Sequence, residues 1–233
     1  MIDEAIILAG GLGTRLKSMV KDVPKPMAPV NGKPFLQYLL NYLHSEGIKR
    51  VILSVGHKHE SISSFFGGHY RSMQIDYAVE STPLGTGGAI SLALQKSILP
   101  DTFILNGDTF FPISLIQLAE KHYSLQAETT MALKEIGQAG RYGTVQLGDD
   151  SYITAFGEKG HPGQALINGG NYVVNKQLFE KRLFSRKYSF EKDYLEKVVT
   201  EHCIAGCVFN SYFLDIGIPE SLIRARDDFQ QFG

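Results

Sequence analysis

An apolar run that ends in glycines constrains the fold of this chain more than any other feature. Residues 5–9 (AIILA) are continuously apolar, and Gly10, Gly11 and Gly13 follow them. Continuous rather than alternating apolarity is typical of a strand buried on both faces, as in the interior of a parallel sheet. A glycine-rich turn after such a strand lets the backbone approach a phosphate group and direct its N–H groups at it. The glycines by themselves fit either a phosphate-binding loop or a tight strand-to-helix turn directly after the first strand.

The segments that follow extend this start into an α/β pattern. Phe35, Leu39 and Leu43 share one helical face, and Gly47 is the expected end of that helix. Ile90, Leu94 and Ile98 predict a second helix, which Pro100 would end. Apolar stretches that read as strands alternate with these helices, at residues 50–55, 75–79 and 102–105. This order predicts an α/β fold with a mixed, mostly parallel sheet flanked by helices.

The second half of the chain is richer in predicted strands. They fall at residues 129–133, 144–147, 153–156, 166–174 and near 211–214. Residues 189–200 have helical spacing, and a last helix is expected from Pro219. We expect one domain over residues 1–233, with a nucleotide-binding half (1–125) and a half (126–233) that adds a strand-rich, ligand-covering lobe.

The charge balance and the first apolar run exclude several partners. Twenty-three basic residues face 24 acidic ones, so the chain has no general electrostatic footprint for nucleic acid or for an anionic membrane. Cys203 and Cys207 lack the further ligands of a structural zinc site and are expected to be free thiols. Asp3 and Glu4 precede a first apolar run that is too short for a signal segment or a membrane span, which favours a cytoplasmic protein. The sequence does not set the oligomeric state and leaves a homo-oligomer open.

Two basic residues near the glycine turn strengthen the phosphate interpretation. The turn matches neither the P-loop, which needs a lysine after its last glycine, nor the dinucleotide fingerprint, which needs a small residue where Leu16 stands. Arg15 instead follows the glycines. Lys25 stands between Pro24 and Pro26, which stiffen the segment that carries its charge.

Residues 10–16 (GGLGTRL), followed by residues 25–27 (KPM), resemble the signature of the sugar nucleotidyltransferases, the nucleoside-diphosphate-sugar pyrophosphorylases. Four later segments resemble further family motifs in the same order: residues 80–89, 106–108, 158–159 and 215–217. The resemblance spans residues 3 to about 228. Ser18 stands where many members have proline, and residues 15–25 instead resemble the branch that activates heptose 1-phosphate with GTP.

The resemblance implies a Rossmann-like nucleotidyltransferase fold and assigns roles to residues of this chain. It implies Arg15, Lys25 and Asp108 as catalytic residues, and Asp108 and Asp215 as ligands of Mg²⁺. The implied nucleotide-binding residues are Leu8, Ala9, Gly10, Gly11, Gly13, Thr14, Glu80, Gly85 and Thr86. The implied sugar-phosphate-binding residues are Gly143, Glu158, Lys159, Asn168 and Tyr172, with Glu191 or Asp193 as a further contact to hydroxyl groups. The substrates would be a nucleoside triphosphate and a sugar 1-phosphate.

The implied chemistry needs positioning of charge rather than a general base. A phosphate monoester has a second pKa near 6, so the attacking oxygen of a sugar phosphate is already ionised at neutral pH. The difficulty is that two polyanions must meet. Arg15 can hold the departing β- and γ-phosphates, Lys25 the α-phosphate, and Lys159 the sugar phosphate.

Glu80 favours GTP over other nucleotides. An ionised carboxylate only accepts hydrogen bonds, and guanine offers two adjacent donors, N1–H and the N2 amino group. Glu80 could instead bind backbone amides of the next loop, so a uridylyl- or thymidylyltransferase acting on a hexose 1-phosphate stays open. An inverting glycosyltransferase would not need Arg15, and a regulatory relative without activity should lack one of the catalytic or metal residues named above. Heptose is favoured over mannose by the resemblance alone.

Overall fold

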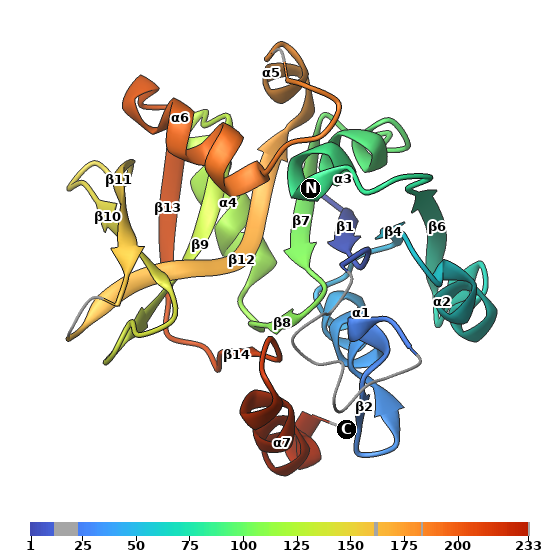
Figure 1. Cartoon of the computed structure of the whole chain (residues 1–233). Helices are drawn as coiled ribbons and strands as arrows, with labels where there is room; N and C mark the ends of the chain where they lie inside the picture. Colours follow the sequence, from blue (N-terminus) through green and yellow to red (C-terminus); the bar gives the residue numbers. More distant parts are fainter. Residues whose placement is uncertain (12–22, 161–162, 183, 233) are drawn as a thin grey trace.

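The computed structural model describes residues 1–11, 23–160, 163–182 and 184–232. Four parallel strands form the centre of the sheet in the order β7-β1-β4-β6 (Figure 1). They are β1 (Glu4–Leu8), β4 (Arg50–Val55), β6 (Met73–Val79) and β7 (Asp101–Asn106). Ile6 and Ile7 are fully buried in cores on opposite faces of this sheet, which confirms a first strand buried on both sides.

The second half of the chain extends the sheet with antiparallel strands. β12 (Ala165–Asn175) pairs antiparallel with β7 and also with β9 (Thr129–Ile136) and β10 (Gly143–Leu147). Beyond them lie β11 (Ile153–Lys159), against β10, and β13 (Ile204–Phe209), parallel to β9. β5 (His69–Tyr70) closes the opposite edge. The predicted mixed α/β sheet with an added strand-rich region is confirmed.

Helices cover both faces of the sheet, and the helices on each face contribute to a separate hydrophobic core. One core takes side chains from α1 (Phe35–Ser45), α2 (His59–Phe66), α4 (Leu115–Leu125) and α7 (Pro219–Asp228). The other takes them from α3 (Gly85–Leu94), α5 (Lys176–Glu180), the π-helix Phe190–Leu195 and α6 (Glu196–Val198). None of the helices in the described part of the chain has the length and apolar character that a membrane crossing needs.

The structure differs from the sequence-based element predictions in several places, and α2, α4 and α5 were not predicted. The helix predicted through Ile98 ends at Leu94, and Ile98 is 78% exposed, because Ser97 turns inward to bind buried Glu4 and Thr102. The strand Ile204–Phe209 was not predicted, since Gly206 interrupts its apolar run. The predicted helix 189–200 is divided into the π-helix, α6 and the 3₁₀ turn Val199–Glu201. Both cysteines are free, as predicted.

Small paired strands bring the end of the chain back to the sheet. β14 (Leu214–Asp215) pairs with β8 (Thr109–Phe110), directly beyond β7 (Figure 1). A 3₁₀ turn, Phe229–Phe232, follows α7. The ring of Phe229 is fully buried 5.8 Å from that of Phe35 and 4.8 Å from those of Tyr38 and Phe110. This cluster fixes the segment that carries Asp215 against α1. The hairpin of β2 (Pro29–Val30) and β3 (Lys33–Pro34) precedes α1.

We predict that Phe229→Ala lowers the free energy of unfolding by about 3–5 kcal/mol, because it leaves a cavity among buried rings. Phe65→Ala is the matched control, since Phe65 is 56% exposed, and it should cost less than about 1 kcal/mol. Denaturant titration of both variants measures the difference. Equal losses would show that the buried cluster does not hold the C-terminal segment in place.

Candidate functional site

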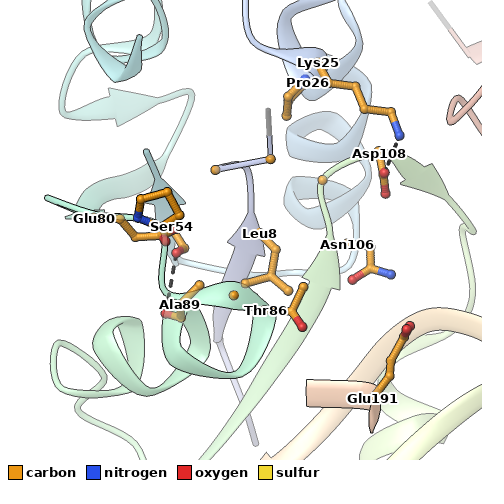
Figure 2. A pocket seen from close by; sticks show the side chains of 15 residues that line it. Leu8, Lys25, Pro26, Ser54, Glu80, Thr86, Ala89, Asn106, Asp108 and Glu191 are labelled. Atoms are coloured by element: carbon orange, nitrogen blue, oxygen red, sulfur yellow. Dashed lines mark hydrogen bonds and ion pairs between the residues drawn. The ribbon is translucent and has the colours of Figure 1, made fainter. Parts of the chain in front are cut away.

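A cavity of about 330 Å³ opens at the carboxyl ends of the four parallel strands (Figure 2). Open α/β sheets bind ligands at this edge. The predicted nucleotide-binding residues in its wall are Leu8, Gly10, Gly11, Glu80, Gly85 and Thr86. Ala9 is buried beside it and donates its N–H to the carbonyl oxygen of Ser54 at 2.7 Å. Gly13, Thr14 and Arg15 lie outside the described residues.

Glu80 is held against the glycine turn at the end of β6. Its Oε2 atom accepts a hydrogen bond from the Leu84 N–H at 2.9 Å. Glu80 therefore binds a backbone amide of the next loop, which the sequence analysis gave as the alternative to base recognition. A Cβ atom at Gly10 would lie 2.6 Å from Glu80 Oε1, so a larger residue there would displace the Glu80 carboxylate. Burial raises the pKa of the Glu80 carboxyl, and the bond from Leu84 opposes that rise.

Lys25 and Asp108 both line the cavity and form an ion pair with each other (Figure 2). Lys25 lies in the 3₁₀ turn Lys25–Met27, directly before Pro26, and its side chain is 13% exposed. Asp108 follows β7, as the sequence analysis expected of a strand-end carboxylate. The proline-flanked lysine therefore places its charge at the ligand-binding edge.

Asp108 and Asp215 are brought together by the pairing of β8 with β14. The Ile216 N–H donates to the carbonyl oxygen of Asp108 at 2.9 Å, and Thr109 is in register with Asp215. Burial, then the charge of Asp108, raises the pKa of Asp215, whereas Lys25 and Arg141 lower it. Mg²⁺ favours one or two carboxylates together with phosphate oxygens and water. Two carboxylates from adjoining segments, one of them in the cavity wall, fit this ion. No cluster of three or more potential ligands occurs among the described residues.

The predicted sugar-phosphate residues lie together on the strand-rich lobe. Gly143 opens β10 opposite Lys159, the neighbour of Glu158 in β11. Asn168 and Tyr172 flank an irregularity in β12, where Asn168 Nδ2 donates to the Tyr172 hydroxyl at 2.7 Å. Tyr172 is 1% exposed, and burial raises the pKa of its hydroxyl group well above the ordinary value. The buried Tyr172 hydroxyl group therefore holds the Asn168 side chain in position through this hydrogen bond.

Glu191 connects this lobe with the cavity. It is one of the residues that line the cavity, on the side opposite Asp108 (Figure 2). Desolvation by the surrounding protein raises the pKa of the Glu191 carboxyl, Lys159 lowers it, and Asp108 raises it. Glu191 and Asp108 therefore line one cavity, and the charge of Lys159 acts on Glu191 from the strand-rich lobe. Asp193 points to its own helix instead, where it accepts from the Ser189 N–H at 2.8 Å.

The π-helix that carries Glu191 is bonded directly to the start of α3. The Phe190 N–H donates to Thr86 Oγ1 at 2.9 Å, and the Gly87 N–H donates to the Tyr188 carbonyl at 3.0 Å. A Cβ atom at Gly87 would lie 2.1 Å from the Tyr188 ring. The nucleotide side and the sugar side of the cavity are thus joined by backbone contacts.

Several wall residues were not identified as site residues from the sequence. Ser54, Pro83 and Ala89 contribute to the cavity, and Arg141 contacts Asp215. A serine inside the apolar run of residues 50–55 was the signal for Ser54. Arg141 stands directly before the predicted Gly143 region, but no local pattern indicates its partner.

The nucleotidyl transferase family matches residues 4–231 of this chain. The chain belongs to that family. D-glycero-alpha-D-manno-heptose 1-phosphate guanylyltransferase of Aneurinibacillus thermoaerophilus is 47% identical over 229 residues, covering 98% of this chain and 99% of that protein. The protein of the same name from Campylobacter jejuni is 44% identical over 217 residues, covering 93% and 96%.

A solved structure extends the family match to three dimensions. The crystal structure of HddC from Yersinia pseudotuberculosis complexed with GMP-PN has a TM-score of 0.87 and 36% identity, covering 98% of this chain and 100% of that one. The resemblance to nucleotidyltransferases inferred from the motifs is confirmed, and the chain is an enzyme of that class. Enzymes of this family generally use a divalent metal ion.

We predict that Thr86→Val lowers the free energy of unfolding by about 1–3 kcal/mol, because it leaves the buried Phe190 N–H without its acceptor. Thr86→Ser keeps the hydroxyl group and is the matched control, which should lose much less. Denaturant titration compares the three proteins. A valine variant as stable as the serine variant would mean that this bond does not fix the π-helix.

Proposed function

We propose that this enzyme transfers a guanylyl group from GTP to D-glycero-α-D-manno-heptose 1-phosphate in an Mg²⁺-dependent reaction that releases pyrophosphate. The observation that carries the proposal is the cavity that Lys25 and Asp108 line together with the Glu80 loop, with Asp215 paired to Thr109 directly after Asp108. The similarity to two heptose 1-phosphate guanylyltransferases and to a structure complexed with GMP-PN supports the choice of substrates. The product would be a nucleotide-activated heptose for surface polysaccharide synthesis in the cytoplasm.

The reaction needs no protein nucleophile. The sugar-phosphate oxygen is ionised at neutral pH and attacks the α-phosphorus, and pyrophosphate leaves from the opposite side. The protein lowers the barrier by holding the two anions in line and by stabilising the negative charge that develops.

Different cations would bind the phosphates of the nucleotide and the phosphate of the sugar. Lys25 lines the cavity, where it would move from Asp108 to the α-phosphate. We assign Arg15 to the departing pyrophosphate, and Lys159, whose charge lowers the pKa of Glu191, to the sugar phosphate. Asp108 and Asp215 would hold Mg²⁺, which when bound neutralises charge on the phosphate oxygens.

We assign guanine recognition to Glu80 and sugar recognition to the strand-rich lobe. Glu80 is already fixed by Leu84, and its carboxylate has lone pairs left for the N1–H and N2–H donors of guanine. Gly143 would let the sugar approach the backbone, while Glu158 and Asn168 would bind hydroxyl groups, with Tyr172 orienting Asn168.

Pyrophosphate release from a matrix of nucleoside triphosphates and sugar 1-phosphates tests the proposed function. GTP with the heptose 1-phosphate should give the highest kcat/KM. Preference for UTP or dTTP with a hexose 1-phosphate would overturn the choice of substrates while leaving the reaction class intact.

We predict that EDTA abolishes turnover and that added Mg²⁺ restores it. Asp108→Asn should lower kcat by roughly 10²–10³ while the melting temperature changes little, because it removes a carboxylate ligand of the Mg²⁺ that neutralises the reacting phosphates. Asp149→Asn is the control, since Asp149 is an exposed aspartate. Full activity in EDTA would contradict the metal assignment.

We predict that Glu80→Gln lowers the preference for GTP over UTP by roughly 10- to 150-fold, since a hydrogen bond to a charged group contributes about 1.5–3 kcal/mol. The amide replaces one acceptor with a donor, so the use of UTP or dTTP should rise at the same time. The measurement is kcat/KM for each nucleotide at a fixed sugar phosphate. A variant that retains full GTP selectivity would show that Glu80 only holds the loop.

A further inference from the structure

Arg141 contacts Asp215 although no step of the proposed reaction uses it. Its Nη2 atom donates to the Tyr142 hydroxyl at 2.6 Å, to the Asp215 carbonyl at 3.1 Å and to Ser221 Oγ at 3.1 Å. The same nitrogen lies 3.3 Å from Asp215 Oδ2. Its guanidinium carbon lies 4.9 Å from the centre of the Tyr142 ring. One guanidinium therefore links the entrance of β10, the strand β14 and helix α7.

The carboxylates of the proposed metal site are each matched by a cation. Lys25 pairs with Asp108, and Arg141 pairs with Asp215. Both cations come from segments distant in sequence from their partners, and both side chains are at most one-third exposed. The remaining oxygen of Asp215, Oδ1, accepts from the Gly217 N–H at 2.6 Å. Both oxygens of Asp215 are therefore already contacted.

We propose that Arg141 is the resident counter-ion of Asp215, a positioning residue that lowers the affinity of the free enzyme for divalent cations. A positive charge beside a ligand oxygen repels an incoming divalent ion, and partial burial strengthens that repulsion. The negative charge of a bound triphosphate offsets it, so the cation binds tightly only together with the nucleotide. This inference rests on the proposed metal site at Asp108 and Asp215.

A purely structural role for Arg141 predicts the opposite change in cation affinity when the residue is replaced. If the guanidinium only braced β14, its removal would displace Asp215 and weaken cation binding. If it acts as a counter-ion, its removal frees an oxygen of Asp215 and strengthens cation binding in the absence of nucleotide. The direction of the change therefore separates the two roles.

The test is a titration of the full-length enzyme with Mn²⁺ in the absence of nucleotide. The electron paramagnetic resonance signal of the free ion measures how much Mn²⁺ remains unbound. Arg141→Gln removes the charge and keeps an amide donor, and we expect its affinity for Mn²⁺ to rise roughly five-fold or more. Arg141→Lys keeps a charge and should stay within about two-fold of the parent. Arg226→Gln removes the same charge from an exposed position of α7 and is the matched control, with no change expected.

Unchanged or weaker Mn²⁺ binding by Arg141→Gln would overturn the inference. Arg141→Met serves as a second charge-removing variant if the glutamine variant does not fold. Asp215→Asn, measured with Mn²⁺ and GTP together, tests the underlying metal site separately. If that variant binds Mn²⁺ as the parent does, the metal site is wrong and the inference fails with it; if it binds more weakly, the metal site stands whatever Arg141 does.

Discussion

The pairing of β8 with β14 brings Asp215 beside the segment that carries Asp108, and the proposed chemistry of the site depends on this contact. Asp108 comes from the end of a central strand, whereas Asp215 comes from near the end of the chain. Neighbouring carboxylates repel one another, which is why the charge of Asp108 raises the pKa of Asp215. Lys25 and Arg141 offset that repulsion, and the buried rings around Phe229 hold the returning segment in place.

Close backbone approach is the second constraint on the site. A side chain at Gly10 would displace the Glu80 carboxylate, and one at Gly87 would overlap the Tyr188 ring. These contacts join the first strand, α3 and the π-helix around a single cavity (Figure 2). Because Glu191 of this π-helix lines the same cavity as Asp108, and Phe190 is bonded to Thr86 of α3, the two sides of the cavity are held together.

The sequence was sufficient to predict features that depend on local pattern. The apolar run of residues 5–9 predicted a doubly buried strand, and the Phe35 to Leu43 spacing predicted α1. Ordered motifs identified the family and placed Glu80, Lys25 and Asp108 in one site. Features that depend on tertiary contacts were not predictable in the same way. Ile98 was assigned to a helix because its spacing fits, whereas the inward turn of Ser97 toward Glu4 decides the backbone there. The contact of Arg141 with Asp215 joins residues 74 positions apart.

Stereochemistry at the α-phosphorus tests the proposed mechanism most directly. Direct attack by the sugar phosphate, with the protein supplying only position and charge, is a single in-line displacement. One diastereomer of GTPαS, turned over with the heptose 1-phosphate and examined by ³¹P NMR, should give a product with inverted configuration at that phosphorus. Retained configuration would require two displacements through a covalent enzyme intermediate, and it would contradict a site built only to position and neutralise charge.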